Sequence, residues 1–122
     1  MLLVKNAEIY APEYLGKKDL LICGGKIECI QDSIRELPVE CEVLDAEGKI
    51  LTPGFLDQHV HITGGGGEGS FHTRTPELQM SELVENGITT VVGLLGTDGI
   101  TRSVDNLYAK TRVLCEAVSY TH

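Results

Sequence analysis

The chain has 122 residues and a formal net charge of −8, with 10 Lys and Arg against 18 Asp and Glu. This acidic balance argues against nucleic acid or an anionic membrane surface as a partner. No apolar run reaches the roughly 20 residues that span a bilayer, and the first residues lack the pattern of a signal peptide. A soluble, cytoplasmic protein of one domain or of parts of two is therefore expected.

The four cysteines form no recognised motif. The spacing of Cys23, Cys29, Cys41 and Cys115 matches no C-x-x-C pattern of zinc or redox sites. Without a secretion signal, a disulfide framework is not expected either. We therefore interpret these residues as small buried hydrophobic side chains.

The first part of the chain, residues 1–52, predicts a small β domain. The pair Gly24-Gly25 between two apolar runs indicates a tight hairpin. Residues 41–45 alternate between apolar and polar, and a turn at residues 46–48 follows them. The predicted strands are residues 2–10, 19–23, 26–30, 41–45 and 49–51.

From residue 53 the pattern changes to a strand, a glycine-rich loop and a helix. Thr75 is a suitable N-cap, Pro76 suits the first helical position and Glu77 suits the positive end of the helix dipole. Asn86-Gly87 provides the signal for the end of this helix. The sequence thus predicts a helix that begins after Thr75.

A second strand and helix complete the chain. Residues 88–95 are rich in β-branched side chains and predict a buried strand, followed by a loop at residues 96–99. A second helix is expected to begin near Ser103, and its apolar side chains are interpreted as core packing. These side chains are Val104, Leu107, Tyr108, Thr111, Leu114, Cys115 and Val118.

These elements predict an α/β fold. Strand, helix, strand and helix with short connections imply a parallel sheet. Residues 53–122 would form the first two βα units of an incomplete TIM-type barrel of the kind found in metal-dependent hydrolases. Two such units cannot close a barrel. The sequence therefore reads as an amino-terminal fragment or a truncated reading frame.

The most informative segment for function is residues 57–61, Asp-Gln-His-Val-His. In a strand, His59 and His61 lie on one face, where two imidazoles can converge on a divalent ion. Asp57 projects to the same face, where its carboxylate could hold an imidazole N–H and fix the tautomer. The carboxyl end of a barrel strand is where catalytic groups are delivered. This context favours a metal site over two ordinary surface or core histidines.

The segments on both sides of this pair carry a resemblance. Residues 53–61 read Pro-Gly-Phe-Leu-Asp-Gln-His-Val-His, and residues 64–68 read Gly-Gly-Gly-Gly-Glu. Further blocks are Thr-Arg-Thr-Pro-Glu at residues 73–77 and Val-Val-Gly-Leu-Leu-Gly-Thr-Asp at residues 91–98. The first motif resembles the amidohydrolase superfamily, and the others resemble its isoaspartyl (β-aspartyl) dipeptidases up to about residue 116.

This resemblance implies a binuclear zinc peptidase that hydrolyses β-aspartyl dipeptides. His59 and His61 would bind the more buried metal, Glu68 would act at the substrate's α-amino group, and Thr97 would help to hold the substrate. The backbone of Gly66 and Gly67 would face a substrate carboxylate. A bridging carboxylated lysine, two further histidines and an aspartate would come from later strands, and Lys110, on the second helix, is no candidate for the bridge. The isolated chain is therefore expected to be inactive.

Other interpretations remain open. Glu68 could be a solvated carboxylate, Thr97 a turn or capping hydroxyl, and residues 64–67 a flexible linker. His72 is expected to face solvent, and no role is assigned to His122. At the level of the protein, the alternatives are another amidohydrolase, similar to dihydroorotase or hydantoinase, and a non-catalytic module that binds a partner or forms a homo-oligomer.

Overall fold

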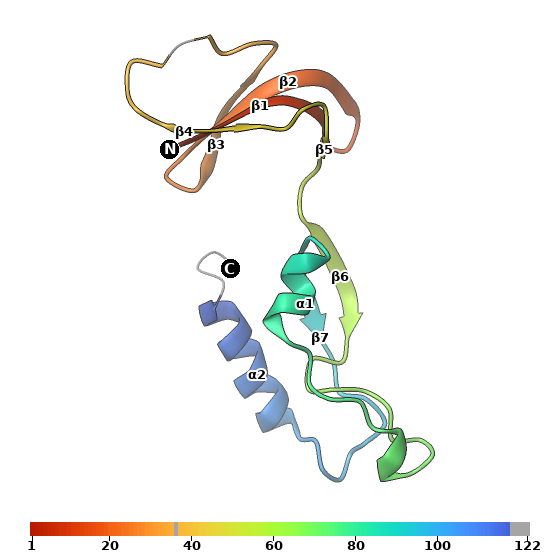
Figure 1. Cartoon of the computed structure of the whole chain (residues 1–122). Helices are drawn as coiled ribbons and strands as arrows, with labels where there is room; N and C mark the ends of the chain where they lie inside the picture. The colour runs from red at the N-terminus through yellow and green to blue at the C-terminus, as the bar shows by residue number, and fades with distance from the viewer. Residues whose placement is uncertain (36, 118–122) are drawn as a thin grey trace. The chain divides into compact units, whose positions relative to one another are not determined.

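A computed structural model describes residues 1–35 and 37–117 (Figure 1). The chain divides into two compact units, Met1–Pro53 and Gly54–His122. Among the described residues, no helix is both long and apolar enough to cross a membrane.

The first unit is a five-stranded sheet built around its first strand. The strands are β1 (Leu2–Tyr10), β2 (Tyr14–Cys23), β3 (Lys26–Gln31), β4 (Glu42–Asp45) and β5 (Ile50–Leu51). β1 pairs with β2 in antiparallel fashion and with β4 and β5 in parallel fashion, while β3 extends the sheet beyond β2. The predicted hairpin between β2 and β3 is confirmed, because Gly24 and Gly25 have φ angles of 56° and 76°, as a two-residue turn requires.

Two expectations about buried residues are wrong, one for this unit and one for both units. β4 does not alternate between buried and exposed, because all four of its residues are exposed. The core lies instead on β1 and β2, where Val4, Ala7, Ile9 and Leu20 form one buried cluster. The cysteines are not fully buried either: Cys23 is exposed, and Cys29, Cys41 and Cys115 are half-buried free thiols. Each lies at the edge of an apolar cluster or beyond it.

The second unit contains a parallel pair of strands with two α-helices. Its elements are β6 (Phe55–Val60), the 3-10 helix η1 (Phe71–Thr73), α1 (Met80–Glu85), β7 (Ile88–Gly93) and α2 (Val104–Ala117). The pairing of β6 with β7 has two register shifts. Ile62, which is fully buried, forms the core with Leu83 of α1 and Leu114 of α2. Each helix thus packs its apolar side onto the strand pair.

The first helix begins later than predicted. Thr75 is not its N-cap, and Pro76 and Glu77 precede it in non-helical backbone. The N-cap is Gln79, which forms a capping box with Glu82. The hydroxyl of Thr75 is already engaged with Gly65, so it cannot cap a helix. The predicted end is confirmed: Asn86 is the C-cap, and Gly87 has a φ angle of 68°.

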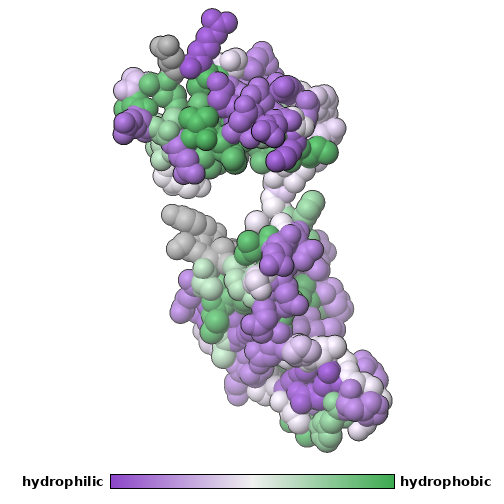
Figure 2. Space-filling model, in the orientation of Figure 1, coloured by the Kyte–Doolittle hydropathy of each residue, from purple (hydrophilic) through white to green (hydrophobic). Residues whose placement is uncertain are grey.

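The apolar stripe of α2 is only partly a core face. Leu114 is buried and Leu107 packs against the core, whereas Val104 and Tyr108 are 69% and 67% exposed. Val118 lies outside the described residues. Both units therefore show hydrophobic side chains at their surface, next to hydrophilic ones (Figure 2).

The predicted α/β fold class is confirmed. A small β unit comes first, and a strand–helix–strand–helix unit follows it, as the pattern of the sequence indicates. β6 and β7 are paired in parallel, as neighbouring strands of a βα barrel are.

Candidate active site

The two histidines of the predicted metal site lie side by side. His59 is the fifth residue of β6, and His61 follows directly after the strand. Their ring centroids are 5.3 Å apart and the ring planes cross at 88°. The expectation that both rings share one side of the strand is therefore confirmed. His59 is exposed and His61 is half-buried.

His61 is oriented by a backbone carbonyl. Its Nδ1 lies 3.3 Å from the carbonyl oxygen of Leu94, which follows β7. In the tautomer that carries the proton on Nδ1, this contact is a hydrogen bond, and Nε2 keeps its lone pair for a metal. Asp57 is placed differently from the predicted contact with an imidazole. Its Oδ1 accepts a hydrogen bond from the backbone N–H of His59 at 3.1 Å.

The glycine loop that follows is held by the chain itself. The backbone N–H of Gly65 donates to Oγ1 of Thr75 at 2.7 Å. The carbonyl of Gly65 accepts from the backbone N–H of Thr75 at 3.0 Å and from its hydroxyl at 3.1 Å. Residues 64–67 are therefore no free linker, because the segment around Thr75 fixes them on one side.

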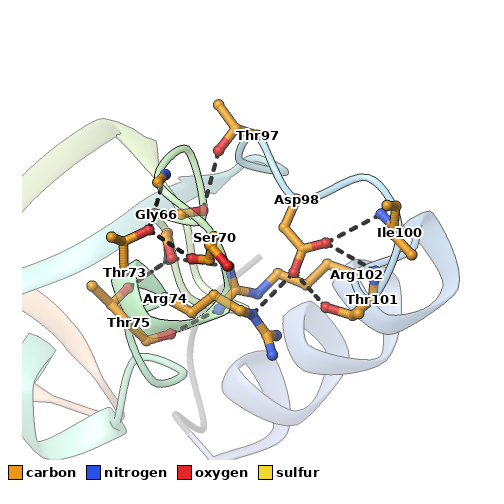
Figure 3. A network of polar contacts seen from close by, with 12 residues as sticks. Gly66, Ser70, Thr73, Arg74, Thr75, Thr97, Asp98, Ile100, Thr101 and Arg102 are labelled. Atoms are coloured by element: carbon orange, nitrogen blue, oxygen red, sulfur yellow. Dashed lines mark hydrogen bonds and ion pairs between the residues drawn. The ribbon is translucent and has the colours of Figure 1, made fainter.

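Thr97 holds the same loop from the β7 side. Its hydroxyl donates to the carbonyl of Gly66 at 3.1 Å, as Figure 3 shows. Gly66 has a φ angle of 73°, and a Cβ at this position would lie only 2.2 Å from the carbonyl oxygen of Thr73. Glycine is thus required there both by backbone conformation and by space. Glu68 follows the glycines and is exposed.

Asp98 organises the loop after β7. Its carboxylate accepts from the backbone N–H groups of Ile100 and Thr101 and from the hydroxyl of Thr101, and it pairs with Nε of Arg74 at 3.0 Å (Figure 3). These hydrogen bonds lower the pKa of Asp98 to about 2, and the bond from the Thr101 hydroxyl has the largest effect. The side chain is only 7% exposed. Asp98 therefore joins the loop after β7 to the segment before α1.

A small hollow lies between these two loops. It has a volume of about 240 Å³, and its lining includes Gly67 and Thr97, with Arg74 and Asp98 as its charged groups. Its apolar members, Phe71 and Ile100, are 68% and 92% exposed. The hollow thus adjoins residues that the sequence assigns to substrate binding.

Sequence reasoning misses three residues of this region. Thr75, Asp98 and Arg102 each fix a loop, whereas the sequence pattern predicts a helix cap for Thr75, a turn for Asp98 and no role for Arg102. A positively charged residue just before a helix carries no local signal of burial, because its partners, Gly65 and Thr75, are far from it in sequence. Only the tertiary fold brings these groups together.

The donor set within the described residues is incomplete for a metal. Among residues 1–35 and 37–117, no three His, Cys, Asp or Glu side chains come together as a metal would require. The two imidazoles fit a metal as ligand types, but stable and selective coordination of zinc uses three or four protein ligands. The two imidazoles alone therefore fall short of such a set of ligands.

Comparisons with known proteins give a consistent result. A crystal structure of β-aspartyl dipeptidase from Fervidobacterium islandicum AW-1 is 51% identical, with a TM-score of 0.81 over 94% of this chain and 32% of that chain. The same enzyme in complex with a β-Asp-Leu dipeptide is 52% identical, with a TM-score of 0.81, over 94% of this chain and 30% of that chain.

More distant relatives carry other names. A dihydroorotase of Staphylococcus epidermidis is 34% identical over 107 residues, which are 88% of this chain and 24% of the relative. A D-hydantoinase (dihydropyrimidinase) from Thermus sp. is 27% identical, with a TM-score of 0.62 over 93% of this chain and 24% of that chain. No protein-family model matches the chain.

The resemblance to the β-aspartyl dipeptidases within the amidohydrolases is therefore confirmed. The chain spans 24% of the length of the dihydroorotase that it matches and 32% of the dipeptidase chain.

Proposed function

We propose, from the likeness of this chain to β-aspartyl dipeptidase, that it supplies the first two metal ligands and part of the dipeptide site of a zinc-dependent β-aspartyl dipeptidase. One observation carries the proposal. The paired imidazoles of His59 and His61 lie beside a glycine loop that leads to Glu68 and is tied to Thr97. In the 52% identical enzyme, the bound molecule is a β-Asp-Leu dipeptide.

The proposed roles follow from the chemistry of each group. His59 and His61 hold zinc through neutral ring nitrogens, and Asp57 supports them through the backbone of His59. Zinc, when bound, lowers the pKa of a coordinated water and polarises the scissile carbonyl. Glu68, exposed on its loop, pairs with the α-amino group of the substrate. The backbone of Gly66 and Gly67, with the Thr97 hydroxyl, positions the dipeptide.

The isolated chain should bind zinc weakly and should not turn over a dipeptide, because the described residues provide only two imidazoles for the metal. Zinc binding to the chain is measured by isothermal titration calorimetry. His59→Ala and His61→Ala should each abolish the binding of one zinc ion. His72→Ala is the matched control, since His72 is exposed and lies in η1, and it should bind as the original chain does. Unchanged zinc binding in His61→Ala would contradict the metal assignment.

Catalysis is tested in a hybrid enzyme, in which this chain replaces the matched 32% of the Fervidobacterium islandicum dipeptidase. The hybrid should hydrolyse β-Asp-Leu. Glu68→Gln should raise KM mainly for substrates with a free α-amino group, and less for N-acetylated ones. Glu85→Gln, at the end of α1, is the control and should leave both unchanged.

A second candidate function rests on the dihydroorotase and hydantoinase relatives. These names indicate hydrolysis of cyclic amides by a related chain. The loop Gly64 to Gly67 followed by Glu68 argues for the dipeptidase, because a carboxylate beside the site matches a substrate ammonium group. Hydrolysis of dihydroorotate or a hydantoin by the hybrid, without hydrolysis of β-Asp-Leu, would favour this second candidate.

A further inference from the structure

Arg102 is a buried charged residue in an unusual position. It lies two residues before α2 and is only 5% exposed. Its Nη1 donates to the carbonyl of Gly65 at 2.9 Å. Its Nη2 donates to the carbonyl of Thr75 at 2.7 Å, and Arg102 and Thr75 are both labelled in Figure 3. One guanidinium group thus joins the glycine loop after β6, the segment before α1 and the start of α2.

The contacts among Gly65, Thr75 and Arg102 form a closed set, which we call the loop clasp. The carbonyl of Gly65 accepts three hydrogen bonds: from Arg102, from the backbone of Thr75 and from its hydroxyl. The carbonyl of Thr75 accepts the second bond from Arg102. A carbonyl oxygen with three donors has little freedom to move, so the peptide group after Gly65 is fixed in direction.

The loop clasp is packed without spare room. Gly64 has a φ angle of 91°, and a Cβ at this position would lie 2.4 Å from the carbonyl oxygen of Thr75 and 2.5 Å from Nη2 of Arg102. The backbone of the loop therefore lies directly against the guanidinium group. Any change in Arg102 is transmitted to the glycines, because no side chain lies between them.

The clasped loop contacts the metal-site histidine. A Cβ at Gly65 would lie 3.4 Å from Cδ2 of His61, and a Cβ at Gly96 would lie 3.7 Å from Nδ1 of the same ring. The half-buried imidazole is thus flanked by two glycines of two loops. Movement of Gly65 would change the space available to the ring and, with it, the contact of Nδ1 with Leu94.

The chemistry of Arg102 is costly for a residue with a purely structural role. Among residues 1–35 and 37–117, no carboxylate pairs with its guanidinium group, and its Nε has no hydrogen-bond partner. Burying a charge without an opposite charge is unfavourable, because the charged group loses its solvation by water. Apolar packing would join the same segments at lower cost. A guanidinium group adds a rigid, planar set of N–H donors, which can bind the carbonyls of Gly65 and Thr75 at the same time.

We propose that Arg102 is a positioning residue, which sets the glycine loop against the His61 ring and so places the loop backbone and Glu68 for the dipeptide. The part of this inference that concerns the dipeptide rests on the proposed function. The part that concerns the loop does not. Arg102 acts through its hydrogen bonds to Gly65 and Thr75.

The loop arm of the test uses amide hydrogen exchange of the full chain, followed by NMR. In Arg102→Met, exchange of the Thr75 amide should rise by about tenfold, the size expected when a hydrogen bond to a charged group is lost. The Phe55 amide, which donates to the carbonyl of Gly87 at 2.9 Å at the start of β6, is the reference and should change less than about twofold. Arg102→Lys, which keeps the charge but not the fork, should fall between the two.

Arg112→Met is the matched control, because Arg112 lies on α2 with its side chain 58% exposed and pairs with Glu116. It should leave the Thr75 amide unchanged. Equal rates at Thr75 in Arg102→Met and the original chain would overturn the proposal. Equal acceleration at Thr75 and Phe55 would also overturn it, since Arg102 would then stabilise the unit as a whole. If Arg102→Met does not fold, the same comparison is made with Arg102→Lys.

The substrate arm of the test uses the hybrid enzyme with β-Asp-Leu. Arg102→Met should raise KM by about tenfold with zinc content unchanged, Arg102→Lys should recover part of this loss, and Arg112→Met should not alter KM. A residue with a structural role alone would lower the amount of active enzyme and leave KM as it was, and that result would overturn the positioning role. If the original hybrid hydrolyses no β-Asp-Leu, the proposed function fails, and the exchange rates alone decide on the loop clasp.

Discussion

Replacing Gly64 with alanine tests the close packing of the glycine loop. The backbone of Gly64 is left-handed, and strain of this kind costs about 1–3 kcal/mol in a residue with a side chain. The new Cβ would also lie 2.4 Å from the carbonyl oxygen of Thr75 and 2.5 Å from Nη2 of Arg102, so these two groups must separate. Losing their hydrogen bond adds about 1.5–3 kcal/mol, because the donor is charged. We therefore expect Gly64→Ala to destabilise the second unit by about 2.5–6 kcal/mol.

Gly16→Ala separates the two contributions. Gly16 has a φ angle of 94°, almost that of Gly64, but a Cβ at this position would meet no atom within 4 Å. This change should therefore cost the first unit only the backbone strain, about 1–3 kcal/mol. Urea unfolding is followed by NMR at amides of each unit, so that each loss is assigned to its own unit. Equal losses for the two variants would refute the close packing of Gly64 against Thr75 and Arg102.

Three further changes test other parts of the structure. Ile62→Ala should destabilise the second unit by about 2–5 kcal/mol in urea unfolding, because Ile62 is fully buried between Leu83 and Leu114; a loss below that of an exposed residue would contradict this core. The pKa of Asp98 is lowered to about 2, so its stabilising contribution is complete above the unfolded value near 4 and is lost as the pH falls through about 2. Asp98→Asn should therefore weaken the dependence of the unfolding midpoint on pH in that window, and an unchanged dependence would show that other carboxylates cause it. Glu82→Ala should remove the carboxylate that accepts from the backbone N–H of Gln79 at 2.7 Å and cost about 0.5–2 kcal/mol in the same unfolding assay, whereas no loss would show that this bond does not hold the start of α1.

The order of the elements was predictable from the sequence because local chemistry determines it. The turn at Gly24-Gly25, the helix end at Asn86-Gly87 and the strand that leads into His59 each depend on neighbouring residues, and all are found in the structure. The pairing of the two imidazoles follows from the alternation of side chains in an extended chain.

The loop contacts could not be predicted in the same way. Thr75 has the properties of an N-cap, but a contact with Gly65, ten residues away, competes for its hydroxyl, and the helix begins at Met80. Arg102 reaches a carbonyl 37 residues away. Such contacts depend on how β6, β7 and α2 come together in space. Asp57 was expected to contact an imidazole. Its carboxylate instead accepts from the backbone N–H of His59, a donor that lies only two residues away in the sequence.

The arrangement of the first sheet has a consequence for any attempt to shorten the protein. β1 holds β2 on one side and both β4 and β5 on the other. Deleting residues 2–10 would therefore not trim an edge but leave three strands without their common neighbour. Truncation from the amino terminus should therefore prevent the whole first unit from folding. A circular permutation that keeps β1 intact should still allow the unit to fold.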